Sequence, residues 1–539
     1  MKHKLLRLIA LVLCCAMLTG CTALTQYWNA IGETFGYRSS ETVPYSQMTY
    51  TRPDMTALTN TFSDVCNAAA GEELEPIINK IWAFYDAYDL FYTQYALANI
   101  RYSGDLTDTY WEEENNFCAD NSPRVDAMLE ELYYALAKSP CLEELESEEY
   151  FGDGYFDSYQ GENNWDEKYT ALMEKESALV SRYYALSAPS GEYESGSEEF
   201  YDACFEEMAQ VLVELNLLRR EMAEYWGYDS YSQFATDFYH YRDYTVAEAR
   251  DYLDQIQEEL VDIFCRVNSS GIWEDGFHPC TETQTYAYVR EMSEKMGGTV
   301  AEAFSLLDKA GLYDIAYGEN KYPSSFEIYL TSYREPFIFM CPGLSTYDHL
   351  TFAHEFGHFC NDYASHGSYA GVDVLEFFSQ GMEYLSLCYV ADTEQLTRMK
   401  MADSLCLYVE QAAFASFEMQ MYEIPAEELS VEALTALYEQ VALDYGFESL
   451  DYDPREFVTV NHYYTNPLYI ISYVVSNDAA MQLYQLEREN PGSGLAVLEA
   501  NLATDERYLR AFLETAGLES PFAEGRLKTV RETFETVFG

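Results

Sequence analysis

The sequence predicts a mostly α-helical protein in which two helical lobes flank a small β-sheet edge. Three long segments, within residues 72–102, 167–187 and 245–267, carry apolar residues at intervals of three and four with charged residues between them, which is typical of amphipathic helices. Two short runs, 326–331 and 336–341, are rich in β-branched and aromatic residues and favour strands. With 539 residues, 48% of them apolar, the chain is long enough to bury a large core.

The first twenty residues have the pattern of an export signal. A positively charged start precedes an apolar run over residues 8–18, and small residues then lead to Cys21. The Leu-Thr-Gly-Cys stretch that ends at Cys21 resembles the lipobox of bacterial lipoproteins. The resemblance implies a signal peptide at 1–20 and lipidation of Cys21, so we expect an extracytoplasmic protein anchored by lipid to the cell membrane. An uncleaved membrane anchor is the weaker alternative, because the apolar run is well short of about 20 residues.

The rest of the chain divides by composition. Residues 21–50 show no sustained periodicity, and we expect them to form a tether between the lipid and the globular part. Helical patterns dominate from about residue 54. A Gly- and Ser-rich break at 188–197 marks a candidate boundary between an N-terminal helical lobe, 51–190, and a second domain, 191–539, which holds the motifs described next.

The two predicted strands are followed at once by a predicted helix. Four turn-forming residues, 332–335, separate the strands. Pro342 and Gly343 then break the chain, after which Ser345, Thr346 or Asp348 can cap a helix that runs to about residue 364. The strands therefore lead directly into the start of this helix.

This helix carries the pattern His-Glu-x-x-His, from His354 through Glu355 to His358. Residues i and i+4 lie on one face of a helix, so both imidazoles can bind one zinc ion while Glu355 reaches a water on the open side of the metal. With 8 histidines in the chain, a chance match has a probability of about one in a hundred. The pattern therefore favours a metal site over two surface histidines.

A hydrolytic zinc ion needs a third protein ligand and one open position. Three carboxylates downstream, Asp373, Glu376 and Glu383, are candidates, and the residues alone leave the choice open. Glu383 lies seven residues, about two turns, beyond Glu376 and so on the same helix face, where it could accept a hydrogen bond from a liganding histidine. A solvent-exposed salt bridge is the alternative role for Glu383.

The motif and the residues after it resemble the thimet oligopeptidase and oligoendopeptidase F family of zinc peptidases. In that family an HEFGH- or HELGH-type helix is followed by a helix on which a Glu just before an A-P-S-Q-like stretch binds the metal. The resemblance implies one zinc ion per chain, held by His354, His358 and Glu376, which precedes Phe377-Phe378-Ser379-Gln380. Glu383 matches a later Glu of the family. Only 17 residues separate His358 from Glu376, which is fewer than usual in this family and close to the spacing in aminopeptidase-like zinc enzymes.

Two further stretches resemble the same family, so that the resemblance covers roughly residues 165–530. Residues 218–256 resemble its helix pair upstream of the site, and the stretch from His462 to Tyr473 resembles its downstream His/Tyr segment. In that family the downstream His and Tyr donate hydrogen bonds to the oxyanion of the tetrahedral intermediate. The resemblance implies this role for His462 and Tyr473, with Tyr469, four residues earlier on the same face, as a further candidate. Such donors favour the transition state over the ground state.

The resemblance implies a zinc-dependent oligoendopeptidase that hydrolyses internal bonds of short, unstructured peptides, with Glu355 as the general base. Long helical segments on both sides of the motif, 54–320 and 394–539, would enclose the strand edge in a deep substrate channel, as in that family. Two alternatives stay open. The ligand spacing favours an aminopeptidase-like zinc peptidase, and the scaffold also suits a catalytically inactive peptide-binding lipoprotein, although the intact His-Glu-His-Glu set argues against inactivity.

The charge of the chain limits its partners. There are 31 Lys and Arg residues against 92 Asp and Glu residues, a formal net charge of −61. Such a protein repels phosphate backbones, which excludes nucleic acid as a partner. The expected partners are short peptides, with basic or neutral sequences collected better than acidic ones.

Overall fold

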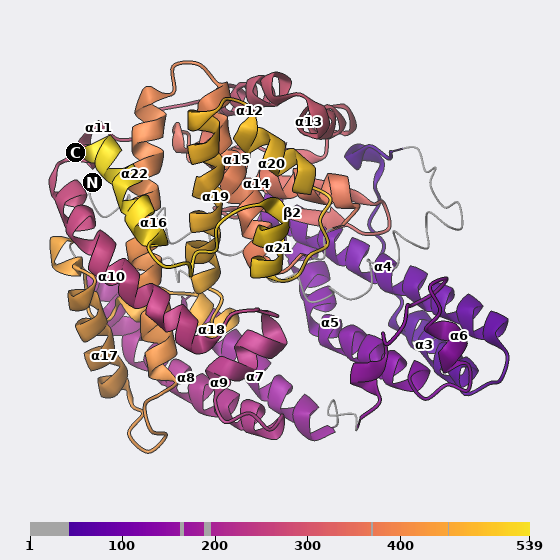
Figure 1. Cartoon of the computed structure of the whole chain (residues 1–539). Coiled ribbons are helices and arrows are strands. Elements are labelled where there is room, and N and C mark those ends of the chain that lie inside the picture. Colours follow the sequence, from indigo (N-terminus) through magenta and orange to yellow (C-terminus); the bar gives the residue numbers. More distant parts are fainter. Residues whose placement is uncertain (1–41, 162–166, 188–195, 368–369, 451) are drawn as a thin grey trace.

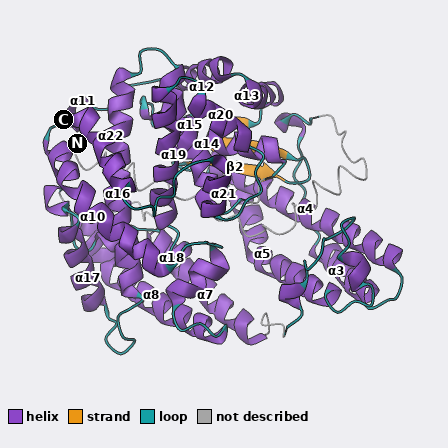
Figure 2. Ribbon diagram, in the orientation of Figure 1, coloured by secondary structure: helices purple, strands orange, loops and turns teal. Residues whose placement is uncertain are grey.

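The computed structural model describes residues 42–161, 167–187, 196–367, 370–450 and 452–539 (Figure 1). Helices form most of this part of the chain, and one three-stranded sheet accompanies them (Figure 2). The predicted fold class, mostly α-helical with a small sheet beside the motif helix, is confirmed. The expected signal peptide and the lipidation site Cys21 lie outside the described residues. No helix among the described residues combines the length and the apolar character that a membrane span requires.

The N-terminal helices form a lobe with its own hydrophobic core, separate from the main core. The side chains of Asp54 and Asp108 accept hydrogen bonds from first-turn backbone amides and so fix where two of these helices begin. Figure 1 shows the lobe at one side of the molecule. Its helices are α3 (Met55–Ala69), α4 (Leu74–Gly104), α5 (Thr109–Leu136) and α6 (Leu142–Leu145).

Residues 167–187 pack with the main body of the protein. The last buried member of the N-terminal core is Phe156, whereas Tyr183 of α7 (Glu167–Ser187) belongs to the main core. The ring of Tyr183 stacks on that of Tyr464, with the centroids 3.8 Å apart, and α7 packs along α8 (Glu198–Tyr225). The main core thus includes Tyr183 of α7 as well as Ala96, Leu97 and Ile100 of α4, so no single point in the sequence separates the two cores.

Residues 42–50, which we expected to be the end of a tether, pack against the fold. They include a short 3₁₀ helix, η2 (Tyr45–Gln47), and the side chain of Met48 is buried. The ring of Tyr45 lies 4.3 Å from that of Phe337, and Arg101 donates a hydrogen bond to the carbonyl of Met48. The described part of the expected tether thus belongs to the globular part.

The main body is a layered arrangement of helices around one large core. At its centre α15 packs against both α14 and α19 (Figure 1). Its remaining α-helices are α9 (Tyr231–Phe234), α10 (Val246–Ser269), α11 (Ile272–Asp275), α12 (Glu282–Met296), α13 (Gly298–Ala310), α14 (Tyr347–Ser365), α15 (Val372–Tyr389), α16 (Glu394–Met421), α17 (Val431–Asp444), α18 (His462–Thr465), α19 (Ile471–Glu489), α20 (Ser493–Asn501), α21 (Leu509–Ala516) and α22 (Arg526–Phe538).

The sheet contains both predicted strands. They are β2 (Ser325–Leu330) and β3 (Glu335–Met340), which pair antiparallel with Phe326 opposite Phe339. A third strand, β1 (Tyr313–Ile315), pairs parallel with β3; with three residues it is too short to show an alternating pattern in the sequence. The order β1-β3-β2 makes β2 an edge strand, and α14 packs against β2 and β3.

The motif helix α14 begins and ends close to the predicted positions. Thr346 is the N-cap residue but makes no side-chain cap bond; instead Asp348, in the first turn, accepts hydrogen bonds from the backbone amides of Gly343 and Ser345 and so ties the preceding loop to the helix. Gly357, inside the motif, lies against α15. A Cβ atom at this position would be 2.5 Å from the carbonyl oxygen of Phe378, so only glycine lets the two backbones approach this closely.

Candidate functional site

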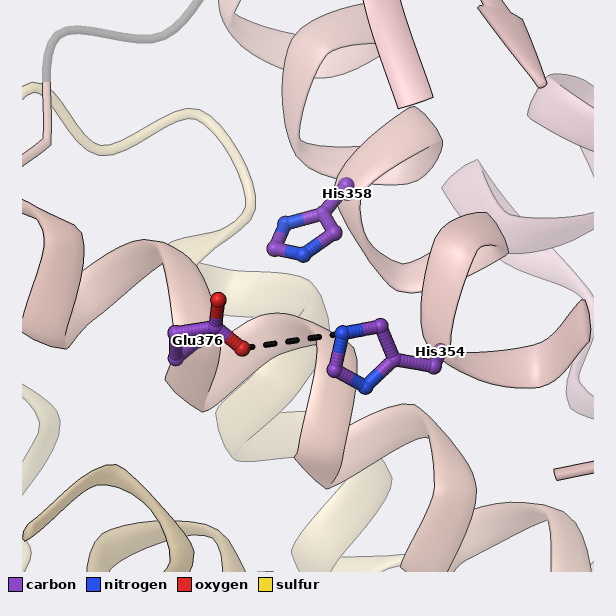
Figure 3. A group of neighbouring side chains, drawn as sticks. All are labelled: His354, His358 and Glu376. Atoms are coloured by element: carbon purple, nitrogen blue, oxygen red, sulfur yellow. Dashed lines mark ion pairs between the residues drawn. The ribbon is translucent and has the colours of Figure 1, made fainter. Parts of the chain in front are cut away.

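Three side chains from α14 and α15 converge (Figure 3). His354 and His358 project from successive turns of α14, and Glu376 faces them from α15. One nitrogen or oxygen atom from each lies within 4.8 Å of the other two, and Glu376 Oε2 is 3.6 Å from His354 Nε2. Two imidazoles and one carboxylate are a donor set that catalytic zinc sites use. These residues form a group that can hold a metal ion.

The surroundings of the two histidines favour a bound cation. Burial lowers the pKa of His358 well below its usual range, so its ring is neutral and has a free lone pair. Burial also disfavours the charged form of His354, but hydrogen bonding to Glu383 and the charges of Glu376, Glu383 and Glu355 outweigh it and raise its pKa to about 9. The same carboxylates would stabilise a positive ion in place of that proton.

Glu383 orients His354. Its Oε1 atom lies 2.8 Å from Nδ1 of His354, so a neutral ring donates its Nδ1–H to Glu383 and directs Nε2 toward Glu376. The other carboxylate oxygen of Glu383 is 2.7 Å from the ammonium group of Lys400 on α16. Sequence analysis did not identify Lys400, because this residue lies on α16, outside the segment that contains the motif.

The third candidate carboxylate, Asp373, is engaged elsewhere. It lies at the start of α15, where its side chain is 3.7 Å from the guanidinium group of Arg242. Glu383 contacts Nδ1 of His354, the ring nitrogen that points away from Glu376. Of the three candidate carboxylates, only Glu376 therefore faces both histidines.

Glu355 belongs to the motif helix α14, and its buried side chain contacts the edge strand β2. The hydroxyl group of Ser325 on β2 donates a hydrogen bond to Glu355 Oε1 at 2.7 Å, and the backbone amide of Glu327 also contacts this carboxylate. Burial raises the pKa of Glu355 to about 6, although the charge of His354 and these hydrogen bonds act in the other direction. A carboxyl group with a pKa near neutrality can both accept and return a proton.

Tyr469 contacts Glu376. Its hydroxyl group donates a hydrogen bond to Glu376 Oε1 at 3.0 Å, and the hydroxyl group of Ser379 lies 3.1 Å from Oε2. Burial is the main cause that raises the pKa of Glu376. The structure thus brings Tyr469 to the carboxylate of the metal-binding group.

His462 and Tyr473 lie beside this contact. The hydroxyl group of Tyr473 is 3.3 Å from Nε2 of His462, and the ring of Tyr469 is 5.1 Å from that of Tyr473. Burial lowers the pKa of His462 to about 4, so its ring is neutral. The downstream candidates therefore form one cluster of neutral donors next to Glu376.

Distant elements hold this cluster in place. The buried guanidinium group of Arg219 on α8 donates hydrogen bonds to the carbonyls of Tyr463 and Tyr464, directly after His462. Glu418 on α16 accepts a hydrogen bond from the amide of Leu468. These supports were missed in the sequence, because each joins segments 50 to 245 residues apart.

Comparison with known proteins identifies a related N-terminal domain and similar folds. Residues 45–165 match the model of the peptidase M3 N-terminal domain. No curated protein matches the chain by sequence. Similar solved structures include a protein described as an oligoendopeptidase F (TM-score 0.78, 20% identity, covering 92% of this chain and 98% of that chain). Another is PZ peptidase A with an inhibitor (TM-score 0.79, 19% identity, covering 91% of this chain and 98% of that chain). A third is a protein from Bacillus anthracis, also described as an oligoendopeptidase F (TM-score 0.75, 20% identity, covering 92% of this chain and 98% of that chain). The chain thus has the fold of oligoendopeptidase F.

Proposed function

We propose that the protein is a zinc-dependent oligoendopeptidase of the thimet oligopeptidase and oligoendopeptidase F family. One observation carries the proposal: His354, His358 and Glu376 converge, with Glu355 beside them, on a fold shared with oligoendopeptidase F. The match of residues 45–165 to a peptidase M3 domain supports the same family.

A zinc ion held by His354, His358 and Glu376 would supply a Lewis acid for the scissile carbonyl and for the attacking water. Glu355 takes a proton from that water and passes it to the leaving amine, for which its pKa of about 6 is suited. His462 and Tyr473 donate hydrogen bonds to the oxyanion. Tyr469, which already donates to Glu376, holds that carboxylate in place.

The sheet edge suggests how a substrate is held. Strand β2 is an edge strand, and its Ser325 contacts Glu355 directly. A peptide that pairs with this edge adopts an extended conformation, and its affinity depends mainly on its backbone. We therefore propose short, unstructured peptides as substrates, lying in a channel between the two lobes, with basic or neutral sequences preferred because of the net charge of −61.

The N-terminal residues are the basis for a proposed site of action. We propose that the chain is cleaved before Cys21, lipidated there and held at the extracytoplasmic face of the membrane, because of the stretch that ends at Cys21. Cys21→Ala should prevent incorporation of labelled fatty acid into the protein. Labelling that persists in this variant would contradict lipidation at Cys21.

A length series of internally quenched peptides tests the function. We expect cleavage of N-acetylated peptides at internal bonds, loss of activity on zinc removal, its return with added zinc, and no digestion of casein. Rates that keep rising well beyond about twenty residues, or efficient casein digestion, would contradict an oligopeptidase.

The ligand spacing favours one alternative, an aminopeptidase-like zinc peptidase. The same peptides separate the two functions, because an aminopeptidase requires a free amino terminus. Refusal of every N-acetylated peptide, together with stepwise trimming of the free ones, would establish the alternative.

A further inference from the structure

Lys400 is a buried charge in contact with the candidate metal site. Its side chain is 1% exposed, and its ammonium group lies 2.7 Å from Glu383 Oε2 and 3.8 Å from Asp403 Oδ2. The ammonium group also lies 4.9 Å from the centre of the Tyr384 ring. Burying an ammonium group costs desolvation free energy unless the group is paired with an opposite charge. The ion pair therefore holds the side chains of Lys400 and Glu383 in place.

Glu383 has one partner for each of its oxygens. Oε2 faces Lys400 on α16, whereas Oε1 faces Nδ1 of His354 on α14, at 2.8 Å. The Glu383 carboxylate on α15 thus connects Lys400 on α16 with His354 on α14. Because one oxygen is held by Lys400, the carboxylate cannot rotate without breaking an ion pair in the protein interior.

We propose that Lys400 is a positioning residue for His354 and acts through Glu383. The inference rests on the proposed function, since it assigns His354 as a metal ligand. Lys400 holds Glu383 so that Oε1 points at Nδ1, and the imidazole ring then directs Nε2 toward Glu376 and the metal. Groups that orient a liganding histidine typically change metal affinity by about 10- to 100-fold when they are removed.

The test is a double-mutant cycle on zinc affinity, measured by competition with a chromophoric chelator. Lys400→Met keeps most of the length of the side chain and removes its charge, and we expect zinc to bind at least about tenfold more weakly. In a Glu383→Gln background the same substitution should change zinc affinity less than about twofold. Equal weakening in both backgrounds would overturn the proposal, because Lys400 would then act through packing alone.

Lys321→Met is the matched control. Lys321 is also a buried lysine, with its ammonium group 2.8 Å from Asp314, and that pair contacts none of the three proposed ligands. Its loss should lower thermal stability without changing zinc affinity. If Lys400→Met does not fold, Lys400→Gln replaces it in the same cycle, with the same outcomes.

A crystal structure of the zinc-free Lys400→Met protein separates this inference from the proposed function. We expect the Glu383 carboxylate to turn away from Nδ1 of His354 in the variant. An unchanged contact near 2.8 Å would overturn the positioning role. If the natural protein binds no zinc, the proposed function fails, and this structure still decides whether Lys400 orients Glu383.

Discussion

The hydroxyl group of Tyr469 donates a hydrogen bond to Oε1 of Glu376, while Oε2 of the same carboxylate lies 3.6 Å from Nε2 of His354. The carboxylate is therefore held from one side and presented to the histidines from the other. This contact distinguishes Tyr469 from Tyr473, whose hydroxyl group lies next to His462.

Tyr469→Phe should weaken zinc binding by about tenfold, because the carboxylate of Glu376 loses one of the groups that orient it. Turnover should recover in excess zinc. Chelator competition and kcat at several zinc concentrations would show this. Normal zinc affinity with a large loss of kcat would instead make Tyr469 an oxyanion donor.

Tyr473→Phe and His462→Ala should lower kcat by about ten- to a thousandfold with little change in KM, because an oxyanion donor acts mainly in the transition state. Tyr463→Phe is a suitable control, since the Tyr463 hydroxyl group donates to the carbonyl of Phe414 and contacts no proposed catalytic group. A pure KM effect would make Tyr473 and His462 substrate-positioning residues.

Glu376→Gln should release zinc, whereas Asp373→Asn should retain it. The Asp373 side chain lies beside Arg242, so its loss affects the start of α15 and not the ligand set. Metal content after gel filtration measures both outcomes. Zinc retained by Glu376→Gln and lost from Asp373→Asn would reverse the assignment of the third ligand.

Glu355→Gln should keep zinc and lose at least about a hundredfold in turnover, because an amide cannot accept the proton from the attacking water. Metal content and kcat on the same preparation check this. Near-normal turnover in the zinc-loaded variant would exclude Glu355 as the general base.

Gly357→Ala should destabilise the protein by about 1–3 kcal/mol and weaken zinc binding, because the added methyl group meets the backbone of α15 and forces the two helices apart. Gly381→Ala is the matched control. A Cβ atom there meets side chains and no backbone: Leu483 at 2.7 Å, which can move, and Leu498 at an ordinary contact distance of 3.7 Å. Thermal unfolding and zinc affinity would show the difference, and equal effects would refute the explanation.

The sequence predicted the parts of this site that depend on short-range patterns. The spacing of His354 and His358 follows from the helical repeat, and strands β2 and β3 follow from composition. Contacts between distant segments have no such pattern. Lys400 and Arg219 reach the site from other helices, and only the folded chain brings them there.

The composition of a segment does not show what that segment packs against. The Gly- and Ser-rich break at 188–197 marks a connection, but the packing of Tyr183 on Tyr464 places α7 with the main body. Residues 42–50 lack periodicity because they form one short turn, yet Met48 is buried. The composition of a segment predicts its local backbone conformation, whereas its burial depends on which distant residues pack against it.

The three proposed ligands all lie within residues 354–376, and this has a consequence for biosynthesis. The ribosome completes this segment about a hundred residues before it reaches Tyr473, a delay on the order of 5–20 s. Closing a short loop costs less entropy than closing a long one. A growing chain therefore possesses every group proposed to capture the metal before it possesses the donors proposed to stabilise the oxyanion, so the full rate of the proposed reaction requires nearly complete synthesis.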